Sequence, residues 1–312
     1  MHFISPISLD NISSTDLDKD YPYWLGGSIN WVVQTFLVLR QYREDVTIST
    51  KPVPRKINIA HVQTWRSLPS QRVEYCVSIR ADYRRLFDVD FEILQNPTAI
   101  CSSKQAYLTY WPIPGIRPRA HNRKTVTNIA YAGRLGNRNI DVSLQDSISK
   151  LNGLNFKLVE KNKWHDMHDI DVLVAVRDFS LSTYNEKPPS KLLNAWHAGI
   201  PLIAGYDSAF SSIGNPGKDY IRVKTKSELL SALEKLRSDP IFYREIVDAG
   251  RMRAKEYTRE KIAKTWLELL DNRIIPDFEL KKNDSDKKYS LKRVADIVSD
   301  SISYVKHSLA KN

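Results

Sequence analysis

A run of nearly continuous apolar residues, DVLVAVRD at 171–178, constrains the fold of this chain more than any other feature. Uninterrupted apolar strands are typical of parallel sheets that helices cover on both faces. Strand patterns flank this run and alternate with helical patterns. The other strand patterns lie at 126–133, 156–161, 201–205 and 219–223, and the helical patterns at 141–153, 190–199, 226–239 and 240–273. This alternation predicts an α/β doubly wound unit in the second half of the chain.

The first half of the chain alternates in a similar way. Apolar runs that predict strands lie at 2–9, 57–65, 74–83 and 91–97. The segment 26–42 has helical period, and its apolar stripe consists of Ile29, Val32, Val33, Phe36, Leu37 and Leu39. Gly26 and Gly27 immediately precede that stripe. Strand, glycine loop, helix and strand predict a βαβ opening, and so a second doubly wound unit.

The segment between the two series, YWPIPGIRPRAHNRKT, carries three prolines and a basic cluster. Proline cannot continue a strand ladder, so this segment is predicted to connect two domains. We expect an N-terminal Rossmann-like domain at 1–120 and a C-terminal one at 121–272. Residues 273–312 are expected to form a polar linker and an amphipathic helix, which either docks on the body or lies on an anionic membrane, with docking favoured.

Composition limits the classes of partner. The 312 residues, 42% of them hydrophobic, suit two domains with substantial cores. A formal net charge of +11 favours anionic partners, namely nucleic acid, anionic lipid or phosphorylated substrates, without choosing among them. Cys76 and Cys101 lack the spacing of zinc ligands and suit a reducing compartment. With no secretory signal pattern and no run near about 20 apolar residues, we expect a cytoplasmic protein, soluble or peripheral at a membrane.

Charged residues cluster just after the predicted strands of the second half. Arg134 and Arg138 follow the strand at 126–133. Ligands of doubly wound sheets bind outside the carboxyl ends of the strands, and arginine forms bidentate contacts with phosphate. Both arginines are therefore candidate anion ligands, although surface arginines are also common after strands.

A second cluster lies in YNEKPPSKLLNAWHAGIPLIAG at 184–205, where a loop turns into a helix. The start of a helix presents free N–H groups and a positive dipole end, which suit an anion. Ser190 is predicted to cap the helix, and Lys187 and Lys191 add positive charge beside it. Glu186 and Asn194, in the loop and one turn into the helix, are predicted to bind sugar or ribose hydroxyls.

This stretch resembles the donor-binding segment of retaining GT-B glycosyltransferases, in which E-x7-E is followed by a helix and A-x-G-x-P-x-x-A. The resemblance covers about 126–270, and more loosely the first half through Gly26 and Gly27. It implies that Glu186 contacts the transferred sugar, that Asn194 contacts the ribose, and that Ser190, Lys191 and Arg134 of AGRLGN hold the diphosphate. Asn194 stands where the family has its second Glu, and KPP stands where it has GFG. The expected Lys after Arg134 is absent, and Arg138, Lys187 or Lys191 are candidates to replace it.

The resemblance also implies that the N-terminal domain holds the acceptor. His61 and Asp82 follow predicted strands there and are candidate general bases if the reaction inverts; a structural His and a capping Asp are the alternatives. Arg80, Gly26 and Gly27 are candidate acceptor-side residues. His165 and His168 have metal-like spacing, but the resemblance favours phosphate binding by helix dipole and basic groups without a metal.

The sequence therefore predicts a glycosyltransferase that moves a sugar from a nucleotide-sugar donor, linked to UDP or GDP, to a hydroxyl of a glycan, polysaccharide or lipid-linked acceptor. No further cofactor and no nucleic-acid partner are expected. The alternatives are a glycosyltransferase-like scaffold without catalysis, which Asn194 supports, and a basic nucleic-acid-binding protein, which the net charge supports. The sugar, the base and the stereochemical outcome stay open.

Overall fold

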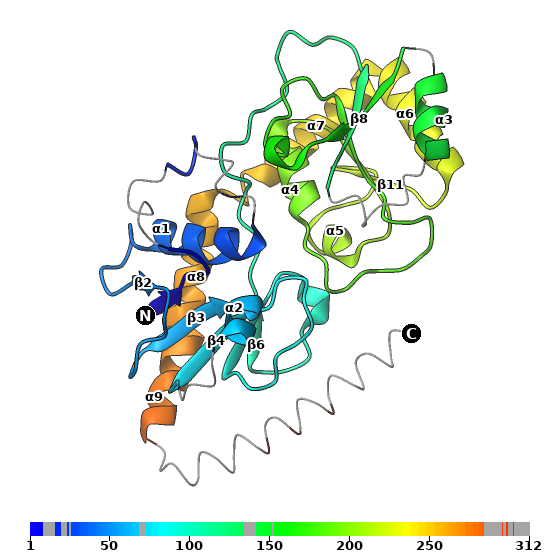
Figure 1. Ribbon diagram of the computed structural model, residues 1–312. Coiled ribbons are helices and arrows are strands. Elements are labelled where there is room, and N and C mark those ends of the chain that lie inside the picture. The colour runs from blue at the N-terminus through cyan, green and yellow to red at the C-terminus, as the bar shows by residue number, and fades with distance from the viewer. Residues whose placement is uncertain are drawn as a thin grey trace. The chain divides into compact units, whose positions relative to one another are not determined.

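The computed structural model describes residues 1–8, 16–19, 24, 26–68, 73–133, 142–151, 153–283, 295, 298 and 302. The chain divides into two compact units. Unit 1 comprises Met1–Thr15, Gly26–Thr109 and Arg259–Asn312, and unit 2 comprises Asp16–Leu25 and Tyr110–Thr258. Each unit contains one parallel β-sheet with helices on it, so the predicted α/β class is confirmed (Figure 1).

The sheet of unit 1 has six strands in the order β2-β1-β3-β4-β5-β6, and every neighbouring pair is parallel. The strands are β1 (His2–Ile4), β2 (Thr47–Ser49), β3 (Ile57–His61), β4 (Tyr75–Ile79), β5 (Phe91–Leu94) and β6 (Gln105–Tyr107). After β2 the chain returns past β1 and continues on its other side. The strand order therefore reverses between β1 and β3, which is the point where doubly wound sheets bind ligands.

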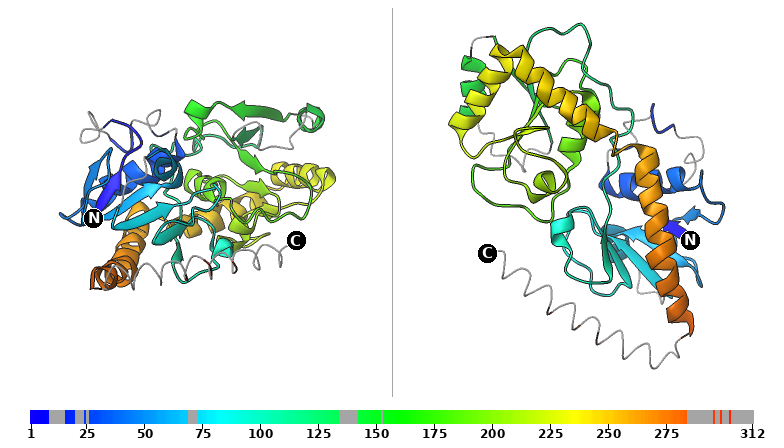
Figure 2. Two further views of the ribbon diagram at one scale, coloured as in Figure 1. Left: turned by 60° about the horizontal axis from the view of Figure 1, so that its bottom comes forward. Right: turned by 180° about the vertical axis from the view of Figure 1, so that it is seen from behind.

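The helices of unit 1 come from both ends of the chain. They are the π-helix η3 (Ile29–Gln34), α1 (Thr35–Leu39), α2 (Val62–Ser67), the 3₁₀ turn η4 (Pro97–Ala99), α8 (Arg259–Leu269), the π-helix η7 (Leu270–Ile274) and α9 (Ile275–Asn283). Trp266 of α8 is fully buried, and its ring lies 6.5 Å from that of Phe3 in β1. The path from α8 to α9 runs along this sheet (Figure 2). The core of unit 1 is thus formed jointly by β1 and by α8, which are far apart in the sequence.

The sheet of unit 2 has five parallel strands in the order β11-β10-β9-β7-β8. They are β7 (Asn128–Ala132), β8 (Asn155–Val159), β9 (Val172–Ala175), β10 (Leu202–Ala204) and β11 (Ile221–Arg222). All four residues of β9 are buried, as its apolar sequence predicts. The strand order reverses between β7 and β9, so the carboxyl ends of these two strands mark the expected ligand position.

Helices cover both faces of this second sheet. They are α3 (Val142–Lys150), the 3₁₀ turn η6 (Lys161–Lys163), α4 (Ser190–Ala198), α5 (Ser208–Ile213), α6 (Lys226–Ser238) and α7 (Pro240–Ala254). Leucines of α6 and apolar residues of α3 share a core with Val172, Val174 and Val176. On α7, Gly250 lies directly against the buried ring of Trp196 from α4.

The division between the units differs from the one the sequence predicts. Residues 110–120, expected in the N-terminal domain, belong to unit 2, because the connector is fastened to that sheet. The fastening point is Asp171, which is fully buried and accepts hydrogen bonds from Arg119, Arg123 and the backbone N–H groups of Thr127 and Asn128. Two arginines of the basic cluster in the connector are thus paired within unit 2.

Residues 259–272, expected in the C-terminal domain, belong instead to unit 1. Residues 275–283, expected in a linker, are helical because their polar side chains have partners on unit 1. Asp277 accepts a hydrogen bond from the hydroxyl of Tyr75 over 2.5 Å and pairs with Lys104, and Lys281 pairs with Asp90 over 2.9 Å. Most of the amphipathic helix predicted at 294–309 lies outside the described residues, and the exposed Val298 and Ile302 are helical.

Candidate functional site

The start of α4 lies at the carboxyl edge of the second sheet. The helix begins at Ser190, and Pro189 occupies the N-cap without a side-chain hydrogen bond. Ser190 is therefore the first helical residue and not the predicted cap. The first backbone hydrogen bonds run from Leu192 and Leu193 to the carbonyl of Pro189, over 2.9 and 3.1 Å. The N–H groups of Ser190 and Lys191 precede these bonds, so the helix itself offers them no acceptor.

Lys191 connects this helix start to the end of β7. Its Nζ atom lies 5.6 Å from the centroid of the Tyr131 ring. A Cβ atom on Gly133, the residue after β7, would lie 3.1 Å from Cε of Lys191 and 2.9 Å from the hydroxyl of Tyr131. The absent side chain at position 133 thus leaves room for the lysine. Since the strand order reverses here, the amine stands where an anionic ligand of this fold is expected.

The loop before α4 carries Glu186 and Lys187, both half-buried. The backbone N–H of Lys187 donates to the carbonyl of Tyr184 over 2.9 Å, which closes a turn that brings both residues to the same edge. Asn194 is also half-buried, and its Oδ1 accepts a hydrogen bond from the N–H of Ile113 over 3.4 Å. The connector therefore uses one face of this amide, and the ribose contact of Asn194 stays a prediction.

Two charged side chains at this edge were missed by the sequence reasoning. Nε of Arg177, which follows β9, donates to Oδ1 of Asp207, which follows β10, over 2.6 Å. Asp207 is 1% exposed, and burial raises the pKa of its carboxyl although Arg177 and Lys191 act to lower it. Arg177 lies two residues beyond β9 and Asp207 three residues beyond β10, which is the sequence signal for both, but the apolar run at 171–178 predicts a strand that includes Arg177.

Tyr184 completes this arrangement. The guanidinium carbon of Arg177 lies 5.5 Å from the centroid of its ring. Its hydroxyl donates to Asp178, and burial together with that hydrogen bond raises the pKa of Tyr184 to about 12. Its φ of 48° lies in the left-handed region, which is strained for a tyrosine. Arg134 and Arg138, predicted to join this site, lie outside the described residues.

In unit 1, His61 is the last residue of β3 and is fully buried. Its Nδ1 accepts a hydrogen bond from the N–H of Gln63 over 3.3 Å, so it caps α2, and its ring meets Tyr83 edge-on at 5.3 Å. Burial lowers its pKa to about 4, against the opposing effect of Asp82. This capping is the structural alternative stated above, and its role as a base stays a prediction.

The other acceptor-side candidates differ in burial. Arg80 is buried, donates from Nε to the carbonyl of Tyr83 over 3.0 Å and lies 4.0 Å from the carboxylate of Glu92. Asp82 is exposed. Gly26 precedes and Gly27 begins the helix that continues as η3, and a Cβ on Gly27 would meet no atom within 4 Å. Of these residues, Gly27 and Asp82 are the ones open to solvent.

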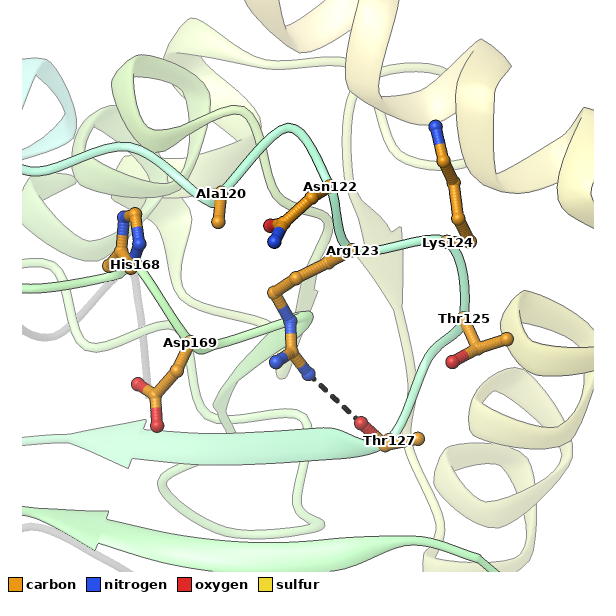
Figure 3. Close-up of a pocket in the computed structure, with 8 residues that line it drawn as sticks. All are labelled: Ala120, Asn122, Arg123, Lys124, Thr125, Thr127, His168 and Asp169. Atoms are coloured by element: carbon orange, nitrogen blue, oxygen red, sulfur yellow. Dashed lines mark hydrogen bonds between the residues drawn. The ribbon is translucent and has the colours of Figure 1, made fainter.

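The opposite, amino edge of the second sheet has a shallow hollow of about 450 Å³, lined by Ala120, Asn122, Arg123, Lys124, Thr125, Thr127, His168 and Asp169 (Figure 3). Arg123 points across it and donates to the hydroxyl of Thr127 over 2.9 Å. A neighbouring hollow of about 590 Å³ contains the ion pairs Arg117–Asp166 and Lys157–Asp169. Because these charges are paired internally, the carboxyl edge is the better candidate site.

Within the described part of the chain, no group of three or more His, Cys, Asp and Glu side chains could hold a metal ion. None of the described helices is long and apolar enough to cross a bilayer. His168 lines both hollows, and the carbonyls of His165 and His168 accept hydrogen bonds from the N–H groups of Arg117 and Ala120, so both histidines lie on the connector side, at the amino edge of the sheet.

Solved structures that match this chain in fold include nucleotide-sugar glycosyltransferases. Anabaena HepE, solved with UDP and glucose, matches with a TM-score of 0.52 at 9% identity, over 80% of this chain and 84% of its own. The chain has the GT-B fold. S. aureus TarM matches with a TM-score of 0.52 at 11% identity over 77% of this chain, and sucrose-phosphate synthase from Thermosynechococcus elongatus with 0.50 at 12% over 70%.

The GT-B fold expected from the resemblance is thus confirmed. The chain spans 58% of the length of TarM and 74% of that of the synthase. No protein-family model and no curated protein matches the sequence. At these identities the likeness establishes the fold alone.

Proposed function

We propose that this protein is a glycosyltransferase that transfers a sugar from a nucleotide-sugar donor to a hydroxyl of a glycan or lipid-linked acceptor. One observation carries the proposal: in a GT-B fold, the start of α4 and Lys191 meet Gly133 at the point where the strand order of the second sheet reverses. A helix start with an adjacent cation suits a diphosphate. The same groups would stabilise the negative charge that develops on the leaving diphosphate.

In this proposal Ser190 and Lys191 bind the diphosphate, with Arg134 and Arg138 as further candidates. Glu186 orients the sugar, and Asn194 contacts the ribose through the part of its amide that Ile113 does not use. The acceptor is bound by unit 1, where Gly27 and Asp82 are accessible. His61 is a weaker candidate for the base than Asp82, because burial already holds it as a neutral cap of α2.

We further propose that donor binding needs no divalent cation, because two backbone N–H groups, a lysine and the helix dipole supply the positive charge. We also propose a cytoplasmic location, with contact to an anionic membrane through residues 294–309 as an additional proposal. Nucleic-acid binding is not favoured, because Arg117, Arg119 and Arg123 of the basic connector are paired with Asp166 and Asp171.

The deciding experiment measures the thermal midpoint with UDP, GDP, ADP and a nonspecific oligonucleotide. One nucleoside diphosphate should stabilise the protein by several degrees, with or without EDTA, and Lys191→Ala should abolish the effect. Lys226→Ala, at an exposed position on α6, serves as the matched control and should leave it unchanged. Salt-sensitive oligonucleotide binding without any nucleotide effect would contradict the proposal. Transfer to candidate acceptors then tests whether the protein is a catalyst or a scaffold without activity.

A further inference from the structure

Arg177 lies two residues beyond the carboxyl end of β9. Its Nε donates to Asp207, and its guanidinium lies against the ring of Tyr184 in the loop before α4. Asp207, its partner, is the N-cap residue of α5. The sheet therefore places this arginine beside α4 and α5, at the edge where the donor is proposed to bind.

The side chain of Arg177 is held in place before any ligand arrives. Asp207 binds Nε over 2.6 Å, and the ring of Tyr184 covers the guanidinium plane at 5.5 Å. The tyrosine is itself fixed by Asp178 through its hydroxyl. An arginine fixed in this way loses little rotamer freedom on binding, which favours bidentate recognition of a planar or tetrahedral oxyanion.

The binding edge of this guanidinium remains open. In the described part of the chain, the terminal nitrogens Nη1 and Nη2 of Arg177 make no hydrogen bond, and they are not among the buried atoms that lack a partner. The side chain is 13% exposed, so this edge reaches solvent while the rest is enclosed. Tyr184, whose ring covers the guanidinium, also accepts a hydrogen bond at its carbonyl from the N–H of Lys187 over 2.9 Å, so the open edge lies beside the loop that leads into α4.

We propose that Arg177 is a bidentate oxyanion ligand for the donor, oriented by Asp207 and Tyr184. This inference rests on the proposed function. The oxyanion has two chemical sources, namely the diphosphate of the donor and the carboxylate of an acidic donor sugar. The second source places Arg177 beside the sugar, and the first places it beside the diphosphate. In either case Arg177 selects for negative charge on the donor.

The test is calorimetric titration of the full chain with UDP and GDP, and then with the neutral-sugar and uronate-sugar nucleotides of the base that binds. Wild type is compared with Arg177→Lys and with Arg177→Gln. The lysine keeps the positive charge but cannot form the two parallel hydrogen bonds of a guanidinium. Arg244→Gln, an exposed arginine of α7, is the matched control. If Arg177→Gln does not fold because Asp207 is left unpaired, the double variant Arg177→Gln/Asp207→Asn removes both members of the pair.

If Arg177 binds the diphosphate, Arg177→Gln should weaken nucleoside diphosphate binding by about 10- to 100-fold, and Arg177→Lys should restore only part of it. If it binds a sugar carboxylate, diphosphate binding should stay unchanged, and a preference for the uronate donor should disappear. If wild type and Arg177→Gln bind the nucleoside diphosphate equally well and also bind the uronate-sugar nucleotide equally well, the role of Arg177 is overturned while the proposed function stands. Absence of nucleotide binding by wild type would overturn the proposed function and this inference with it.

Discussion

Trp196 of α4 faces Gly250 of α7 so closely that a Cβ at position 250 would lie 2.6 Å from Cδ1 of the indole. The indole is buried, and its Nε1 donates to the carbonyl of Asp219 over 2.9 Å, so the ring cannot simply turn away. This contact fixes the distance between the helix that begins at the candidate site and the helix that supports it. Gly250 is therefore a packing glycine within a helix.

Gly250→Ala tests this contact. Alanine gains about 1 kcal/mol of helix propensity over glycine, but overpacking a rigid buried ring costs about 1–3 kcal/mol. We expect the overpacking to outweigh the gain in helix propensity, so the free energy of unfolding, measured with urea, should fall by on the order of 1 kcal/mol. Glu245→Ala, at an exposed position of the same helix, should change stability by less than about 0.5 kcal/mol. Equal or greater stability of Gly250→Ala would show that the two helices separate readily.

We expect the attachment of the connector to the second sheet to weaken at low pH, because it depends on the ionised carboxylate of Asp171. Burial would raise its pKa, but Arg123, the N–H groups of Asn128 and Thr127, and Arg119 outweigh burial and lower the pKa from 3.8 to about 2. A lowered carboxyl pKa stabilises the fold above pH 4 by about 2 kcal/mol, and this stabilisation is lost as the pH falls from about 4 to 2.

Asp171→Asn measures that contribution. It should lower the thermal midpoint clearly at pH 6, and the difference from wild type should shrink toward pH 2. Asp248→Asn, an exposed carboxylate on α7, serves as the control with little effect. A difference that is the same at pH 6 and pH 2 would contradict the assignment of the fastening to the ionised carboxylate.

His61 is expected to titrate far below an ordinary histidine. Burial lowers its pKa from 6.5 to about 4, so the unfolded chain binds a proton there that the folded chain does not. Stability from this residue is therefore complete above pH 6.5 and falls as the pH drops from 6.5 to 4. His61→Asn, which keeps a capping acceptor, should remove this part of the pH dependence. NMR titration of the ring, assigned by the same variant, checks the value; a midpoint near 6.5 would refute it.

Gly133→Ala tests whether the position of Lys191 matters for ligand binding, with little effect on the stability of the fold. The added Cβ would approach Cε of Lys191 and the hydroxyl of Tyr131, at 3.1 and 2.9 Å. Because a lysine end is flexible, we expect a small change in the thermal midpoint but a several-fold loss of nucleoside diphosphate affinity. Unchanged affinity would mean that Lys191 does not bind the phosphates.

Gly27→Ala provides the matching test on the acceptor side. A Cβ there meets no protein atom within 4 Å, and the residue lies in the first turn of a helix, so the fold should be unaffected or slightly more stable. A rise in the acceptor KM without a change in donor affinity would show that an acceptor approaches this backbone. Unchanged kinetics would remove Gly27 from the list of acceptor-side residues.

Regular apolar patterns predicted most of the fold. The strands β7, β9 and β10 and the helices α4 and α6 lie where their patterns indicate, because each buries a face that the sequence marks. The three-residue strands β2 and β6 carry no such pattern, since β2 is partly exposed and both are the outer strands of their sheet. The return of α8 to unit 1 depends on contacts such as Trp266 with Phe3, which no local spacing reveals.

The candidate site was predicted unevenly. Lys191 and the start of α4 follow from helix periodicity and from the rule that ligands bind at the ends of strands. Arg177 and Asp207 could be recognised only as a pair, because their significance comes from β9 and β10 being neighbours in the sheet. Asn194 was predicted by position in a motif, whereas its contact with Ile113 depends on the path of the connector.

The placement of Trp266 in the core of unit 1 also has a consequence for biosynthesis. Unit 2 is complete once residue 258 has been made, whereas unit 1 lacks α8 until synthesis has passed residue 269. During synthesis, unit 2 should therefore fold before unit 1, although β1 of unit 1 is made first. Phe3 stays uncovered until α8 is available.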